Sequence, residues 1–160
     1  MAFNLEKNKN RVQDIKKNIE TKKGEQESLE RSKEEVMQEG MEIQGSNLEE
    51  KAMQTAMEGV NMELENISDR GKELADEMKG DFSELETLRE ETQETMEGTD
   101  AEKKKLEKKK ELLDKLGLGK GLESAINELS DSQQNLDSFA QTVMETQKEL
   151  DAVQGKLGRL

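Results

Sequence analysis

The chain has 160 residues, of which 30% are hydrophobic, 39% are charged and 2% are aromatic, so it is too polar to bury a thick globular core. It contains no histidine and no cysteine, which removes the commonest ligands of zinc, copper and iron and most nucleophile and base pairs of enzymes. We therefore expect no catalysis and no bound metal or cofactor, and the net charge of −13 disfavours binding to nucleic acid.

The composition favours helices along the whole chain, because proline is absent and Glu, Lys, Gln, Met, Leu and Ala are all good helix formers. Residues 1–12 hold no apolar run of signal-peptide length, and no segment approaches the ~20 apolar residues of a membrane span. We expect an all-α chain that is cytoplasmic when synthesised and that needs a route without a signal peptide for any export.

Residues 4–44 form the first predicted helix, because its apolar residues fall on a repeat of alternating threes and fours. The members of this seam are Leu5, Val12, Ile15, Ile19, Leu29, Val36 and Ile43. The seam is weakest in the middle, where Lys22, Gln26 and Lys33 replace apolar residues and Gly24 lowers helix propensity.

The first predicted turn follows directly after this helix. Gly45 is suited to the left-handed conformation that closes a helix, and Ser46 with Glu49 three residues later has the spacing of a capping box. Together with Ile43 these residues make a turn motif, and we expect two long helices to fold back on each other there.

Residues 47–97 form the second predicted helix, with apolar residues at intervals of three and four from Ala52 to Leu85. Ala52, Ala56 and Gly71 are small enough to let a neighbouring helix approach closely, although small residues are also ordinary helix filler. This segment is the most acidic part of the chain.

A second reversal is predicted at Gly98 and Thr99, because Thr99 with Glu102 repeats the capping-box spacing. A lysine-rich helix follows over 100–116, a glycine-rich break over 117–121, and a final helix over 122–157. Among the polar residues on the seam of this last helix is Gln133.

These elements predict an elongated antiparallel helical bundle or coiled coil of three long helices, arranged up-down-up, with the third helix broken near 117–121. We place a long hairpin in 1–97 and an additional helical segment in 98–160. A layout with a further reversal at 117–121 competes, but that break lacks a Ser, Thr, Asp or Asn to cap a new helix.

The apolar seam near the first turn is the candidate partner interface. Its members are Val36, Met37, Met41, Met53, Met57, Val60 and Leu64. Methionines either fill gaps in a core or form an adaptable patch for another helix. Because the seam is thin, we expect it to be buried against a helical protein partner or in a homo-oligomer, unless residues 98–157 pack across it.

Residues 1–97 resemble the small helical-hairpin proteins of bacterial type VII secretion, the WxG-type family and its LXG relatives. In that family Trp-x-Gly or Leu-x-Gly occupies the turn between two helices, where this chain has Ile43-Gln44-Gly45. The family also places an aromatic residue four before an acidic one near the end of the second helix, and Phe82 and Glu86 have this spacing. The resemblance implies a secretion-associated role with Phe82 and Glu86 as an export signal.

A structural coiled-coil role is the alternative prediction. A scaffold of a phage particle or a cytoplasmic adaptor needs only helices, acidity and solubility, which this composition supplies. Neighbouring genes separate the two predictions, since a type VII ATPase or LXG toxin gene favours export and capsid or tail genes favour scaffolding.

Overall fold

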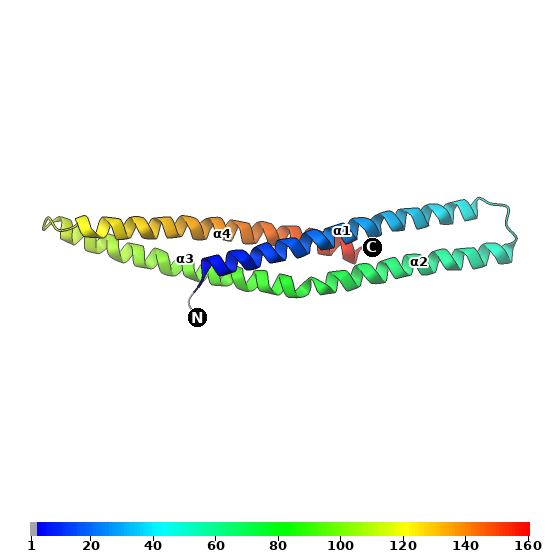
Figure 1. The fold of residues 1–160 in the computed structure, drawn as a ribbon, viewed down its shortest axis with the longest axis horizontal. Coiled ribbons are helices and arrows are strands. Elements are labelled where there is room, and N and C mark those ends of the chain that lie inside the picture. The colour runs from blue at the N-terminus through cyan, green and yellow to red at the C-terminus, as the bar shows by residue number, and fades with distance from the viewer. Residues whose placement is uncertain (1–2) are drawn as a thin grey trace. The chain divides into compact units, whose positions relative to one another are not determined.

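The computed structural model describes residues 3–160, and 91% of this range is helical. Its helices are α1 (Leu5–Gln44), α2 (Glu50–Glu77), α3 (Lys79–Asp114) and α4 (Lys120–Gly158) (Figure 1). Residues 3–160 contain no strand, so the prediction of an all-α helical bundle is confirmed.

The helices build two compact units. The first unit comprises residues 3–13 and 83–147, and the second comprises 14–82 and 148–160. Because α1, α3 and α4 each cross a boundary between these ranges, each unit draws on two separate parts of the chain.

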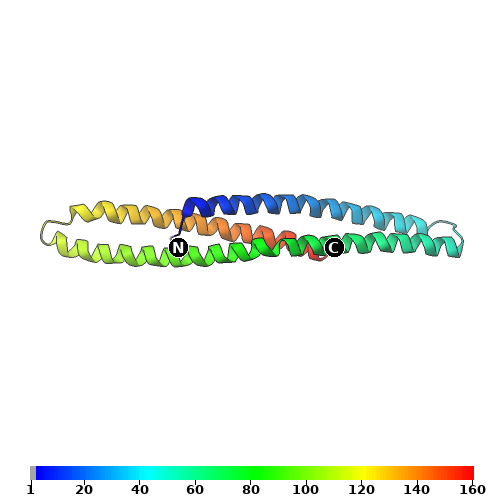
Figure 2. The ribbon, with the colours of Figure 1, turned by 60° about the horizontal axis from the view of Figure 1, so that its bottom comes forward.

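In the second unit α1 and α2 lie side by side in opposite directions (Figures 1 and 2). The end of α4 packs on both: the Gln154 amide donates to the Ala75 carbonyl at 3.1 Å, and the Lys33 ammonium donates to the Leu160 carbonyl at 3.2 Å. The buried apolar residues of this unit are Ile15, Ile19, Val36, Val60, Ile67, Leu74, Met78, Leu150, Val153 and Leu157.

Gly71 explains how the end of α4 comes so near to α2. A Cβ atom at this position would lie 2.5 Å from the Leu157 carbonyl oxygen and 3.1 Å from the Leu160 side chain. The small residue therefore permits a close helix approach, as its place on the predicted seam suggested.

In the first unit α3 and α4 run in opposite directions, and the start of α1 packs beside them. The Gln147 amide donates to the Glu86 carboxylate at 2.9 Å, and Gln133 donates to Asp100 at 3.2 Å further toward the turn. The rings of Phe3 and Phe139 meet edge to face, with their centroids 6.2 Å apart. The buried apolar residues here are Val12, Leu85, Leu88, Leu136, Phe139 and Val143.

The predicted reversal at Gly98 and Thr99 is wrong, because α3 continues without a break to Asp114. The Thr99 hydroxyl donates to the Thr95 carbonyl at 2.9 Å and so joins the helix instead of capping a new one. One glycine in a long helix costs about 1 kcal/mol relative to alanine, which neighbouring helical residues offset. The predicted boundary between residues 97 and 98 falls inside this helix.

The chain reverses instead at residues 115–119, as in the competing layout. The predicted third helix is therefore divided, because residues 98–114 belong to α3 and the final helix is α4. Gly117 has a φ of +75°, the only positive φ among the described residues. The Leu118 amide donates to the Leu113 carbonyl at 2.8 Å, and the Gly117 amide donates to Asp114 at 3.1 Å. This pair of hydrogen bonds is the Schellman motif, which closes α3 without any capping side chain.

Exchanging glycine for alanine at Gly98 and Gly117 tests this placement of the turn. We expect Gly117→Ala to destabilise the fold by about 1 to 2 kcal/mol, because a left-handed conformation is strained for any residue with a Cβ. Gly98→Ala should stabilise it by about 0.5 to 1 kcal/mol. Urea unfolding followed by circular dichroism measures both, and a reversed order would place the turn at Gly98.

Gly71→Ala should destabilise the second unit by about 1 to 3 kcal/mol, because the new methyl group would collide with the backbone of α4. Gly59→Ala is the matched control, since Gly59 is also in α2 and no atom lies within 4 Å of its missing Cβ. Thermal unfolding of the two variants should therefore shift in opposite directions, and equal shifts would rule out the close approach.

Candidate functional site

The predicted turn motif adopts a different geometry from the one expected. Gly45 lacks a positive φ, and its amide donates to the Met41 carbonyl at 3.0 Å. The Ser46 hydroxyl donates to the Ile43 carbonyl at 2.6 Å, so it closes α1 rather than opening α2. Glu49 is the N-cap residue of α2 and makes no side-chain cap, so the predicted capping box does not form.

Several residues of the candidate partner interface are used inside the hairpin. Val36 and Val60 are buried together with Ile67, and Leu64 and Ile43 pack against them. The helices come so close that a Cβ added at Gly40 would lie 3.2 Å from a methyl carbon of Val60. These residues therefore hold α1 and α2 together, and only the methionines of the candidate interface remain to form a surface for a partner.

The methionines divide into two groups. Met53 and Met57 are half-buried in α2, whereas Met37 and Met41 in α1 are 51% and 71% exposed. Glu34 precedes Met37 by three residues and Glu30 precedes Met37 by seven, so all four residues share one side of the helix. We call Glu30, Glu34, Met37 and Met41 the acidic methionine stripe.

The polar residues on the first seam are paired or buried inside the second unit. The Lys22 ammonium forms an ion pair and hydrogen bond with Glu77, Gln26 is 2% exposed, and Lys33 reaches Leu160. The internal alternative therefore holds for this stretch, because the end of α4 and the facing α2 cover it. Beyond Lys33 and Gly71, α4 has ended, and α1 and α2 pair only with each other in this unit.

The two residues of the predicted export signal are each half-buried. Phe82 belongs to the second unit, and its amide donates to the carbonyl of Met78, the residue between α2 and α3, at 3.0 Å. Glu86 belongs to the first unit and accepts the hydrogen bond from Gln147. Neither side chain is freely exposed to a receptor.

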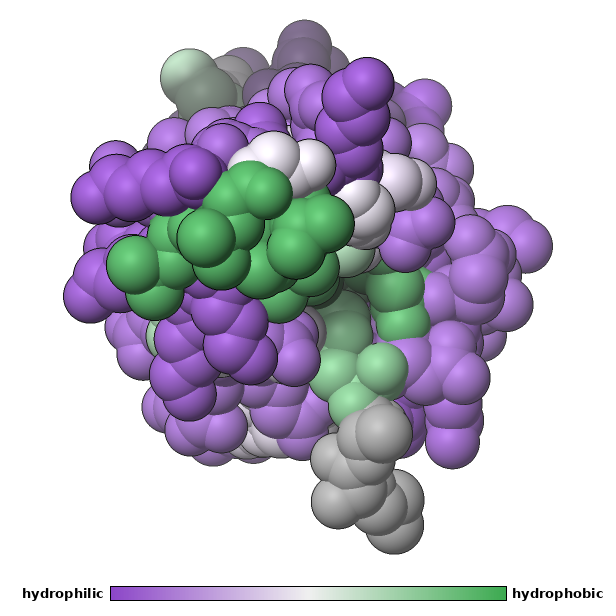
Figure 3. Space-filling view, turned by 90° about the vertical axis from the view of Figure 1, so that its left-hand side faces the viewer, coloured by the Kyte–Doolittle hydropathy of each residue, from purple (hydrophilic) through white to green (hydrophobic). Residues whose placement is uncertain are grey.

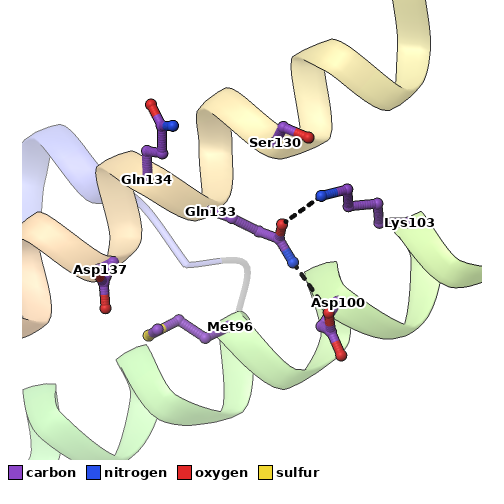
Figure 4. Close-up of a pocket in the computed structure, with 7 residues that line it drawn as sticks. All are labelled: Met96, Asp100, Lys103, Ser130, Gln133, Gln134 and Asp137. Carbon is purple, nitrogen blue, oxygen red and sulfur yellow. Dashed lines mark hydrogen bonds between the residues drawn. The ribbon is translucent and has the colours of Figure 1, made fainter. Parts of the chain in front are cut away.

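A shallow cleft in the first unit holds a small polar network between α3 and α4 (Figure 4). Gln133 accepts a hydrogen bond from Lys103 at 3.3 Å and donates one to Asp100 at 3.2 Å. The hydrogen bond from Lys104 is the largest cause that holds the pKa of Asp100 below its usual range. The Gln133 side chain therefore joins the two helices across this cleft.

The turn between α3 and α4 carries an apolar surface that sequence reasoning missed. Leu112 and Leu116 are 64% and 72% exposed, and Leu118 in the turn is also exposed. Figure 3 shows hydrophobic side chains gathered at this end of the first unit, with hydrophilic side chains around them.

Lysines continue this surface along α3. Lys105 and Lys109 are exposed and precede Leu112 by seven and three residues, which places all of them on one side of the helix. We call Lys105, Lys109, Leu112 and Leu116 the basic leucine stripe. The spacing of the stripe is present in the sequence, within the segment 100–116 that was predicted as a lysine-rich helix.

Glu77→Gln tests the ion pair that Glu77 forms with Lys22 on the polar seam. The hydrogen bond from Lys22 is the largest cause that lowers the pKa of Glu77 from 4.5, so the pair stabilises the fold above pH 4.5 and is lost as pH falls through the lowered pKa. We expect a slightly lower Tm than the unaltered protein at neutral pH and no difference in strong acid. The matched control Glu73→Gln also removes a carboxylate that pairs with Arg70, and it should keep the natural acid dependence.

Residues 3–160 contain no group of three or more acidic side chains placed to hold a metal ion. Within the same range no helix combines the length and the apolar character that a bilayer span requires. Comparison of the chain with models of protein families, with curated proteins and with solved structures finds no match.

Proposed function

We propose that this chain is a non-enzymatic interaction protein that binds a helix of another protein along the acidic methionine stripe. The observation that carries the proposal is the exposure of Met37 and Met41 directly beside the buried pair of Val36 and Val60. A contiguous exposed apolar surface is typical of protein interaction sites, and Met37 and Met41 extend the apolar core of the hairpin to the surface.

The position of the stripe supports a helical partner. The end of α4 occupies the third place beside α1 and α2 as far as Lys33 and Gly71, and the stripe begins on α1 at the same level. A helix from a partner fits where α4 stops, because two helices with a thin seam gain apolar contacts from a third. Unbranched methionine side chains adapt to different helix surfaces.

We further propose that this chain belongs to type VII secretion, as a substrate, partner or targeting module. The support is the hairpin of α1 and α2 with Ile43-Gln44-Gly45 at its turn, and the spacing of Phe82 and Glu86. In this role Phe82 and Glu86 form the export signal, and local opening around α3 exposes them to the receptor.

A structural coiled-coil scaffold or adaptor is the second candidate. The continuous apolar seams in both units favour it, since such seams need no secretion partner. The genes beside this one separate the candidates, because a type VII ATPase gene supports export and capsid or tail genes support a scaffold.

Replacing Met37 and Met41 together by glutamate should weaken binding to a small helical protein encoded beside this chain by about tenfold or more, because two apolar contacts become charged. Calorimetric titration measures the change. Met62→Glu is the control, since Met62 is 64% exposed but lies outside the stripe. Equal binding by all variants would exclude the stripe as the interface.

A further inference from the structure

We infer that the helix bound by the acidic methionine stripe is α3 of a second copy of this chain, which docks its basic leucine stripe there in parallel register. This inference rests on the proposed function, because it names the partner of the same surface. The two stripes belong to different units, so every copy offers one stripe of each kind.

The spacing of the two stripes is the same. Each has two charged residues followed by two apolar residues, at positions i, i+4, i+7 and i+11. This is the spacing of a coiled-coil seam, in which such residues lie along one side of a helix. Two surfaces with this shared spacing can meet residue by residue over three turns.

The charges decide the direction of the docked helix. In parallel register Lys105 faces Glu30 and Lys109 faces Glu34, while the leucines face the methionines. In antiparallel register each charged pair would face apolar side chains and lose its partner. Two copies of the same stripe would bring like charges together in parallel register and would place charged against apolar side chains in antiparallel register, and both arrangements are unfavourable.

The charged members of both stripes are free for such contacts. Among residues 3–160 no ion pair involves Lys105, Lys109, Glu30 or Glu34. All are exposed except Glu30, which is half-buried.

Each stripe lies where its own unit lacks a third helix. On α1 the stripe begins at the level where α4 ends. On α3 the start of α1 lies beside Glu91 and Thr95, and Lys109 occupies the same side as Glu91 five turns further on. The start of α1 does not extend along that side, so an incoming helix meets an open surface.

A second copy fits this surface better than an anionic membrane does. The protein as a whole carries −13, whereas residues 34–58 around the methionines are acidic and complement the lysines directly.

The contact is small and joins unlike surfaces. Four apolar side chains and two ion pairs give an interface below the usual size of stable complexes, so we expect self-association at about 10 to 100 µM. Because the contact is heterologous, further copies can add unless two copies close on each other.

Sedimentation velocity over a range of concentrations tests the inference with charge-swapped variants. One variant carries Lys105→Glu and Lys109→Glu, and the other carries Glu30→Lys and Glu34→Lys. Each alone should remain monomeric, because its two stripes now have the same charge. An equimolar mixture should associate as the natural protein does, since each variant then offers the complement of the other.

The control variant carries Lys72→Glu and Lys79→Glu. These substitutions make the same change in net charge as those at Lys105 and Lys109, but at exposed positions outside both stripes. It should associate like the natural protein, and raised salt should weaken the association of both. Association of either swapped variant alone, or failure of the mixture, overturns the inference. Sedimentation of the natural protein with vesicles of equal phosphatidylserine and phosphatidylcholine, without self-association, also overturns it in favour of a membrane.

Disulfide trapping tests the parallel register of the two stripes. Because the chain has no native cysteine, only the introduced cysteines can form a disulfide. A Leu116→Cys variant should form a mixed disulfide with an isotope-labelled Met41→Cys variant, because a disulfide requires Cα atoms within about 7 Å. With a labelled Glu30→Cys variant it should not. Preference for the second pair would overturn the parallel arrangement.

Failure of this inference is distinguishable from failure of the proposed function. Leu112→Glu with Leu116→Glu should abolish self-association yet leave binding of a foreign helical protein unchanged. Met37→Glu with Met41→Glu should abolish both. If only the foreign protein binds, and does so through the methionines, the function stands and the second copy is excluded as partner.

Discussion

The shortage of apolar side chains on α1 is the constraint on which the second unit depends. Ile15 and Ile19 are buried on the seam of this helix. Further along the same seam, Lys22, Gln26 and Lys33 take the place of apolar residues. A two-helix hairpin would leave those polar groups half-desolvated without partners, which is costly. In the second unit, α2 and the end of α4 cover this polar part of the seam. Beyond Lys33 the seam is more apolar, and there α1 and α2 pack on each other without α4.

The helices themselves could be predicted from the sequence, because helix formers and a three-four repeat of apolar residues act locally. The turns could be predicted only in part. Gly98 with Thr99 and Gly117 all carry plausible breaking signals, and the difference lies in which carbonyl groups need partners at the helix end. At Gly117 two backbone amides satisfy them, so no capping side chain was required and the rule that favoured Gly98 was misleading.

The candidate site could also be predicted only in part from the sequence. The first turn lies where the sequence predicted it, and the three-four repeat of α1 includes Val36 but neither Met37 nor Met41. The repeat alone does not tell whether a methionine beside the seam is buried, since that depends on how α2 packs on α1. The basic leucine stripe was missed because exposed leucines contradict the expectation that a seam is buried.

The discontinuous make-up of the two units has a consequence for how the chain folds. The contact of Lys22 with Glu77 closes a stretch of 55 residues, whereas the contact of Lys33 with Leu160 joins positions 127 residues apart. Shorter loops close at a lower entropy cost and therefore sooner. The hairpin of α1 with α2 and the hairpin of α3 with α4 thus form before the end of α4 reaches α1. Gln26 and Lys33, the part of the polar seam that the end of α4 covers, are therefore the last part of the second unit to leave water during folding. In native fluctuations this part is also the place where amide protons exchange when the end of α4 detaches.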